Sequence, residues 1–159
     1  MNAFKLLLIA ATAFAQAPSK PAVVNASTVV FVCEHGAAKS VIAAAYFNRL
    51  ATENKLPYRA VARGTTPDET VAPAVRAGLV ADGLEVSMSK PKRVTDEDIA
   101  GAARVVSLAT DLAEKKPAVK VKLLEWNDIP SVSQDYGAAR AAIVREVEKL
   151  VANLAAGIK

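Results

Sequence analysis

TVVFVCEHGAAKS, residues Thr28–Ser40, is the clearest indication of the fold in this chain. Its first five residues are β-branched or aromatic, a run typical of a strand that is buried on both faces of a parallel sheet. The small and polar residues that follow predict a loop. Residues 40–52 then predict a helix. We expect its buried face to draw on Val41, Ala44, Ala45, Tyr46 and Leu50.

The rest of the chain alternates between strand and helix patterns. Further strands are predicted over residues 58–62, 104–108 and 119–124, and a turn over 63–68. Helices are predicted over residues 69–82, from 95 onward and over 136–154. Strands separated by helices favour an α/β three-layer sandwich, in which helices cover both faces of a four-stranded parallel sheet.

Local signals mark the ends of two of these helices. Gly83 stands where a glycine cap would end the helix over 69–82, whose inward residues are expected to be Val75, Leu79 and Val80. Thr95–Asp98 has the form of a capping box, which starts the next helix.

Length and composition indicate one domain, over residues 27–159. The chain has 159 residues, 52% of them hydrophobic, which is enough for a single core. The formal net charge is +4. Because the basic residues are scattered among acids and do not alternate with aromatics, we expect no nucleic-acid partner. A small anionic substrate fits this charge better.

The N-terminus reads as a signal peptide over residues 1–15, with cleavage after Ala15. The alternative is an N-terminal helix that anchors the protein to a membrane, but ten apolar residues are too few to cross a bilayer. Residues 16–26 contain two prolines and read as a linker. We therefore expect a periplasmic or secreted protein with no membrane partner after processing.

Cys33 is the only cysteine, so it forms no disulfide within the chain. It falls at the carboxyl end of the first strand, where parallel sheets bind ligands, and just before a helix. Backbone amides at that helix end would hold an anion, and the same field favours a nucleophilic thiolate. The alternative is a buried cysteine that serves only as a small apolar side chain.

The loop CEHGAAKS resembles the Cys-x5-Arg-Ser loop of low-molecular-weight protein tyrosine phosphatases and of the arsenate reductases that share their fold. The segments ARGTTPD, GLVADGLEV, VTDEDIAGAARVVSL and WNDIP follow in the family's order, so the resemblance spans roughly residues 28–152. His35 and Ala37 resemble the arsenate reductase form of the loop.

The resemblance implies a role for each residue of the loop. Cys33 would be the nucleophile that attacks phosphorus or reduces arsenic, and Ser40 would donate a hydrogen bond to its thiolate. The oxyanion would be bound by the backbone amides of Glu34, His35, Gly36, Ala37, Ala38 and Lys39.

Lys39 departs from the family, which has arginine at this position. An ammonium is a point charge and lacks the fork with which arginine grips two oxygens. Anion binding should survive, whereas the loss of one preorganised donor can cost on the order of 10²–10³ in rate. Arg63 is a conceivable substitute, although a merely solvated arginine fits its position as well.

The general acid is the second departure, because the family's Asp-Pro pair does not occur in this chain. Alignment of Trp126–Pro130 places Ser131 at the usual aspartate. The nearby candidates are Asp128, which we prefer, and Asp135. Either carboxylate would equally suit a turn that it stabilises through its own backbone.

The sequence leaves the roles of two loop residues open. His35 would either pair with the thiolate as an imidazolium or make a structural hydrogen bond. Glu34 would oppose anion binding unless its side chain points away. One cysteine and one histidine supply too few ligands for a metal, and no cofactor is expected.

Three functions remain in competition. The first is hydrolysis of a phosphate monoester, tyrosine phosphate or another ester on a protein or a small molecule, through a cysteinyl-phosphate. The second is arsenate reduction by Cys33 with an external thiol, and the third is an oxyanion-binding module without turnover. All three take phosphate or arsenate as the partner.

Overall fold

The computed structural model describes residues 26–86 and 89–157. The expected signal peptide and residues 16–25 of the expected linker lie outside these described residues. Among the described residues, no helix combines the length and the apolar character that crossing a membrane requires.

The sheet has four parallel strands in the order β2-β1-β3-β4. Their bounds are β1 Ser27–Cys33, β2 Tyr58–Gly64, β3 Ala102–Leu108 and β4 Leu123–Trp126. The buried run Val29–Val32 lies on the inner strand β1, as expected of a strand covered on both faces. The predicted α/β class and parallel sheet are confirmed.

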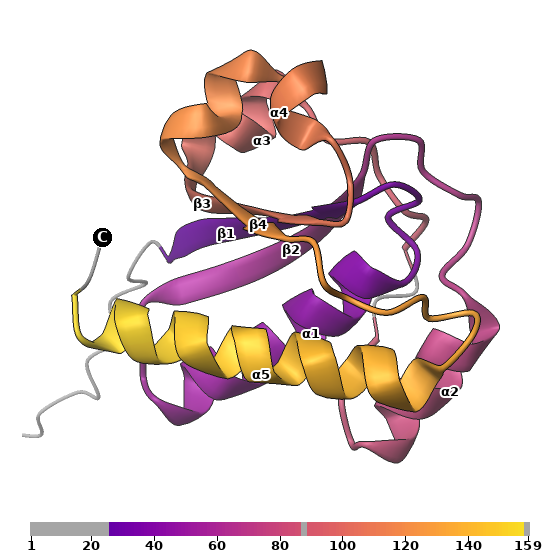
Figure 1. The fold of residues 1–159 in the computed structure, drawn as a ribbon. Coiled ribbons are helices and arrows are strands. Elements are labelled where there is room, and N and C mark those ends of the chain that lie inside the picture. The colour runs from indigo at the N-terminus through magenta and orange to yellow at the C-terminus, as the bar shows by residue number, and fades with distance from the viewer. Residues whose placement is uncertain (1–25, 87–88, 158–159) are drawn as a thin grey trace, which may run out of the picture.

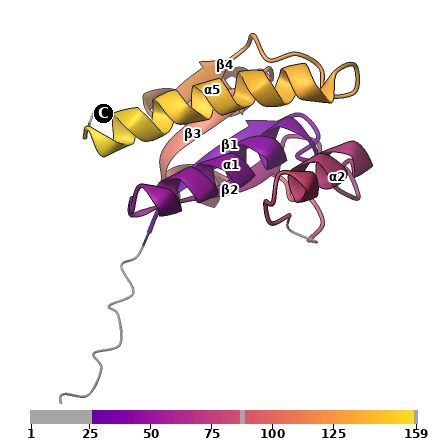
Figure 2. The ribbon, with the colours of Figure 1, turned by 90° about the horizontal axis from the view of Figure 1, so that it is seen from below.

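Helices cover both faces of the sheet (Figure 1). One face carries α1 (Lys39–Glu53), α2 (Pro73–Ala81) and α5 (Tyr136–Ala155), and the other carries α3 (Asp96–Gly101), α4 (Leu112–Lys115) and the 3₁₀ helix η1 (Pro117–Val121). Figure 2 shows α1 and α5 running side by side along the sheet. The larger of two apolar clusters lies beneath them, and the smaller one lies beneath α3, α4 and η1.

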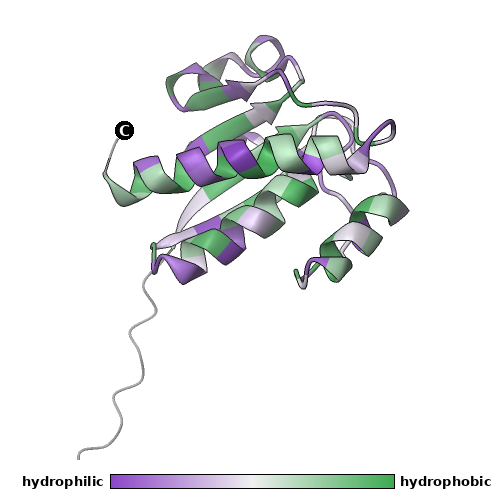
Figure 3. Cartoon of the chain, turned by 60° about the horizontal axis from the view of Figure 1, so that its bottom comes forward, coloured by the Kyte–Doolittle hydropathy of each residue, from purple (hydrophilic) through white to green (hydrophobic). Residues whose placement is uncertain are grey.

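The buried face of α1 differs from the prediction. Ala44 and Tyr46 are buried as expected, but Val41, Ala45 and Leu50 are only half-buried. The helix packs against the sheet and α5 together, which turns a different set of residues inward: Ile42, Ala43, Phe47 and Ala51. The predicted buried face assumed that the helix packs against the sheet alone, whereas it packs against both the sheet and α5. In Figure 3 hydrophilic and hydrophobic residues alternate along α5.

The predicted helix over 69–82 begins later, at Pro73, because proline suits the first turn of a helix. Val75 and Leu79 are buried, but Val80 is 63% exposed, so its inward placement was wrong. Residues 75 and 79 are one turn apart, whereas residue 80 lies a further 100° around the helix. Gly83 has a φ of +70° just beyond the helix, as its predicted capping role requires.

The predicted strand over 119–124 was mostly wrong. Residues 117–121 form the 3₁₀ helix η1, and the strand begins only at Leu123. Val119 is fully buried, while Val121 is 94% exposed. Alternation of apolar and polar residues over so few positions does not distinguish a strand from a tight helical turn, and Pro117 starts that turn. The capping box at Thr95 is confirmed, with both of its hydrogen bonds present.

Candidate active site

The loop between β1 and α1 is held from its outer side by the segment that follows β2. Amides of this segment donate to the loop's carbonyl groups at 2.8–3.1 Å, in the pairs Thr65 to Cys33, Thr66 to Glu34, Asp68 to His35 and Ala72 to Ala37. Within the described residues, the amides of residues 34–38 find no acceptor. The loop is therefore left with unpaired donors that can bind an oxyanion.

Gly36 and Gly64 allow this close approach. A Cβ on Gly36 would lie 2.7 Å from the backbone nitrogen of Gly64, and one on Gly64 would lie 2.8 Å from that of Gly36. Gly36 also has a φ of +61°. The backbone of β2 therefore packs directly on the loop, in a way that only two glycines permit.

Cys33 ends β1 at the entrance to α1 and is only 6% exposed. Its Sγ lies 3.2 Å from Oγ of the fully buried Ser40. A hydroxyl at this distance can donate to a thiolate, and the first turn of α1 adds the positive end of a helix dipole. Sulfur, hydroxyl and amides thus converge at the carboxyl end of the inner strand.

Replacing Ser40 with alanine is expected to lower the rate of alkylation of Cys33, and any turnover that depends on it, by on the order of 10- to 100-fold, since a hydrogen bond to a charged group contributes about 1.5–3 kcal/mol. Iodoacetamide labelling at neutral pH measures the effect. Ser107→Ala removes another buried serine, on β3, and serves as the control. Equal labelling of both variants would show that Ser40 does not act on the sulfur.

Lys39 does not lie free in the loop. Its Nζ donates to the carbonyl oxygen of Ile129 at 2.9 Å, which ties the loop to the segment after β4. Burial lowers the pKa of Lys39, and the negative charge of Cys33 opposes that effect. The ammonium therefore serves as a link between two parts of the site as well as a charge beside the sulfur.

A pocket of about 350 Å³ opens at Cys33. Its walls are the loop, the end of β3 at Leu108 and Ala109, and Ser131–Ser133 of the segment that precedes α5. Asp128, the preferred general acid, is exposed and does not line this pocket. Asp135 accepts a hydrogen bond from the Ala138 amide at 2.8 Å and caps α5.

The structure therefore brings neither candidate aspartate to Cys33. The pocket wall is made instead by Ser131, whose Oγ lies 2.9 Å from Oγ of Ser133. Sequence reasoning placed Ser131 at the family's aspartate, but it gave no sign that Ser133 and Ile129 also contribute to the site. Both depend on how the irregular segment 127–135 is folded.

His35 turns both ring nitrogens toward carboxylates. Nδ1 lies 3.2 Å from Oδ1 of Asp68, and Nε2 lies 3.8 Å from Oε2 of Glu34. All three side chains are more than half exposed, and His35 and Glu34 line the pocket. The structure therefore places His35 in contact with one carboxylate of the loop and one beyond it, and its pairing with the thiolate stays a prediction. The Glu34 side chain points at His35, which is the arrangement that allows an acidic residue next to Cys33 without opposing anion binding.

Arg63 is not a substitute for the loop arginine, and it is not merely solvated. Its Nε and Nη2 donate to the two carboxylate oxygens of Asp98 at 2.8 and 2.9 Å. Burial alone would raise the pKa of Asp98, but hydrogen bonds from Arg63 and from the Thr95 amide outweigh it and hold that pKa below its usual value. The pair joins β2 to α3.

Asp98→Asn is expected to lower the free energy of unfolding by about 1–2 kcal/mol at neutral pH. Because the folded-state pKa of Asp98 is lowered, the stabilisation is present above the unfolded value of about 3.9 and is lost as pH falls through the folded value. Urea unfolding of both proteins from pH 7 to 3 should therefore converge at acid pH. The control is Asp96→Asn, on the same helix but 80% exposed, which should change little. A constant gap at all pH values would contradict the ion pair as the cause.

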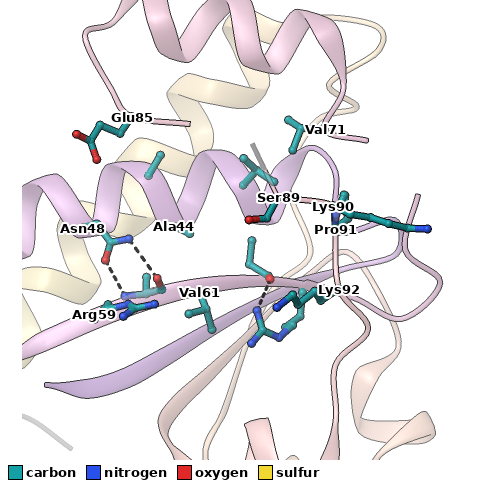
Figure 4. Close-up of a pocket in the computed structure, with 16 residues that line it drawn as sticks. Ala44, Asn48, Arg59, Val61, Val71, Glu85, Ser89, Lys90, Pro91 and Lys92 are labelled. Carbon is teal, nitrogen blue, oxygen red and sulfur yellow. Dashed lines mark hydrogen bonds between the residues drawn. The ribbon is translucent and has the colours of Figure 1, made fainter. Parts of the chain in front are cut away.

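A second and larger pocket, of about 390 Å³, lies along β2 and behind the loop. Figure 4 shows Asn48 of α1 facing Arg59 and Val61 of β2, with Ser89–Lys92 at one end. Asn48 of α1 bonds both backbone groups of Ala60 there, at 2.7 and 3.1 Å, and so covers part of the exposed edge of β2. Cys33 does not line this pocket. Within the described residues, no three His, Cys, Asp or Glu side chains gather so as to hold a metal ion.

The structure is thus that of an α/β domain that presents a cysteine within an oxyanion-binding loop. Residues 28–158 match the family model for low molecular weight phosphotyrosine protein phosphatases, and the chain belongs to that family. It is therefore an enzyme of the phosphatase type, which acts on phosphorylated substrates.

Solved structures share the fold at low sequence identity. A protein tyrosine phosphatase from Entamoeba histolytica is 15% identical, with a TM-score of 0.73 over 83% of this chain and 99% of that one. The arginine phosphatase YwlE from Geobacillus stearothermophilus is 20% identical, with a TM-score of 0.61 over 83% and 92%. A thioredoxin-dependent arsenate reductase from Corynebacterium glutamicum is 23% identical, with a TM-score of 0.61 over 86% and 63%. No curated protein matches significantly.

Proposed function

We propose that this protein hydrolyses a phosphate monoester through a covalent intermediate on Cys33. The observation that carries the proposal is the geometry at the end of β1, where Sγ lies 3.2 Å from Ser40 at the base of a loop with unpaired amides. The amides can bind three phosphoryl oxygens while the sulfur approaches the phosphorus atom from the side opposite the leaving group. Family membership independently favours the same chemistry.

The reaction proceeds in two displacements. The Cys33 thiolate forms a bond to phosphorus, and the bond between phosphorus and the ester oxygen breaks with its electron pair on that oxygen. Water then attacks the cysteinyl-phosphate, the sulfur–phosphorus bond breaks, and the thiolate and inorganic phosphate are released. The loop amides stabilise the charge on the phosphoryl oxygens in both steps.

The test is hydrolysis of p-nitrophenyl phosphate by the purified protein under reducing conditions, compared with Lys39→Arg. We expect turnover that vanadate inhibits, and an increase of on the order of 10- to 100-fold in Lys39→Arg, because the guanidinium can hold two oxygens at once. No turnover by the wild type, with turnover by Lys39→Arg, would show an oxyanion-binding module that has lost its activity. Silence in both would end the phosphatase proposal.

Arsenate reduction is the second candidate, favoured by the loop's His35 and by the fold shared with an arsenate reductase. Cys33 is the only cysteine in the sequence, so its arsenic adduct would have to be resolved by an external thiol. Consumption of glutathione or reduced thioredoxin that requires both arsenate and Cys33 would support this function.

We also propose that the protein is exported. Support comes from the short apolar run and the Ala-x-Ala pattern that ends at Ala15. Fractionation of cells that express the full chain, with N-terminal sequencing of the product, tests the proposal. A mature protein that begins at Gln16 outside the cytoplasm is the expected result, and an intact N-terminus in the cytoplasm would overturn it.

A further inference from the structure

Outside the loop, the polar side chains that line the pocket are a pair of serines. Ser131 and Ser133 both line the pocket, and their Oγ atoms are 2.9 Å apart. A group that leaves phosphorus must depart in line with the sulfur and away from it, into the pocket that these two serines help to line. A hydroxyl donates hydrogen bonds, but at neutral pH it does not give up its proton.

The other polar side chains of the pocket are occupied elsewhere. The carboxylate of Glu34 and the imidazole of His35 face each other. The Lys39 ammonium is bound to the Ile129 carbonyl and is the positive charge beside the sulfur. Protonation of the leaving oxygen by Lys39 would remove that charge while the negative charge on the phosphoryl group is still present.

Two hydroxyls side by side suit an anion with two oxygens. If one serine rotates to release its bond to the other, each can donate to a separate oxygen of a carboxylate. The other residues outside the loop that line the pocket are apolar: Leu108, Ala109 and Val132. Among the described residues that line the pocket, there is no aromatic ring against which a tyrosine ring could stack.

We propose that the site acts on acyl phosphates and similarly activated phosphoryl compounds, whose leaving group departs as a stable anion that Ser131 and Ser133 bind. This inference rests on the proposed phosphatase function and specifies its substrate class. Thiolate attack transfers the phosphoryl group to Cys33 and releases a carboxylate with the bonding electron pair. No proton is needed in that step, and water hydrolyses the cysteinyl-phosphate in the next.

The experiment compares kcat/KM for benzoyl phosphate, p-nitrophenyl phosphate, phenyl phosphate and phosphotyrosine with the purified protein. Because a general acid contributes on the order of 10²–10⁴ when the leaving group needs a proton, we expect benzoyl phosphate to exceed phenyl phosphate by at least that factor. The values should follow the acidity of the leaving group across the series.

Variants at the serine pair make the test specific. Ser131→Asp introduces a carboxylic acid, and it is expected to raise kcat/KM for phenyl phosphate by on the order of 10²-fold below neutral pH. The same variant should lower kcat/KM for benzoyl phosphate, because the new carboxylate repels the benzoate that departs as the leaving group. Ser131→Asn has nearly the same shape without an ionisable proton and is the matched control, so it should not give the gain.

Three results would overturn the inference while leaving the phosphatase function intact. One is equal kcat/KM for benzoyl and phenyl phosphate. Another is a gain with Ser131→Asn equal to that with Ser131→Asp. The third is a selective loss of phenyl phosphate turnover in Lys39→Arg, which would identify Lys39 as a proton donor. Silence toward every substrate, in the wild type and in Lys39→Arg, would instead refute the proposed function and the inference together.

Discussion

Cys33→Ser is expected to lower kcat for p-nitrophenyl phosphate by on the order of 10⁴-fold or more, since loss of a nucleophile in a two-step reaction leaves only binding and oxyanion stabilisation. A serine hydroxyl in this position is far less ionised than a thiol, so the field of the α1 N-terminus cannot make it an equivalent nucleophile. Stopped-flow and steady-state release of nitrophenol measure the loss.

The fold should be unaffected by this change, because the substitution replaces one buried small atom by another beside Ser40. Vanadate binding to Cys33→Ser, followed by the shift in thermal unfolding, is the control for an intact loop. Activity within tenfold of the wild type would show that turnover does not pass through Cys33. Loss of both activity and vanadate binding would show that the variant had disturbed the loop.

Gly36→Ala is expected to have the second largest effect, on both activity and stability. Its Cβ would meet the Gly64 nitrogen at 2.7 Å, and alanine would also have to adopt a φ of +61°. The left-handed conformation costs roughly 1–2 kcal/mol and overpacking a further 1–3 kcal/mol. Because the loop would shift away from β2, its amides would move relative to Cys33, and a shift of about 1 Å can cost on the order of 10²-fold in rate.

Substitutions at two other glycines distinguish the cost of the left-handed conformation from the cost of overpacking. Gly83→Ala keeps the positive φ, at +70°, but has no atom within 4 Å of the new Cβ, so it reports the conformational cost alone. Gly64→Ala has the close contact, at 2.8 Å, without the positive φ. Urea unfolding and p-nitrophenyl phosphate turnover of all three variants should place Gly36→Ala lowest in both. If Gly36→Ala were no worse than Gly83→Ala, the close packing of the loop on β2 would not matter.

Some of the site could be predicted from sequence because it is local. Cys33 follows a strand and precedes a helix, so its place at the edge of the sheet follows from chain connectivity, and Ser40 falls in the first turn of α1. The hydrogen-bond partners of Lys39 and Arg63, and the position of Asp128 outside the pocket, could not be predicted. The bonding partners of Lys39 and Arg63, Ile129 and Asp98, lie 90 and 35 residues away in the chain.

The errors in the secondary structure have the same origin. Long segments with strong periodicity, such as α5, were predicted almost to the residue. The short segment after α4 was misread because four or five residues cannot show a period, and the contacts that bury Val119 lie elsewhere in the chain. The buried face of α1 was partly misread because it depends on α5, which is distant in sequence.

The order of strands and helices, the parallel sheet and the position of a cysteine within an oxyanion-binding loop could all be predicted, because they depend on hydrophobic periodicity and on neighbours in the chain. The groups that surround that cysteine depend on tertiary contacts. The amides of residues 65–72 turn the loop's carbonyls outward, and segment 127–135 brings two serines to the pocket and no aspartate. Such contacts join residues that packing alone brings together, and no local pattern encodes them.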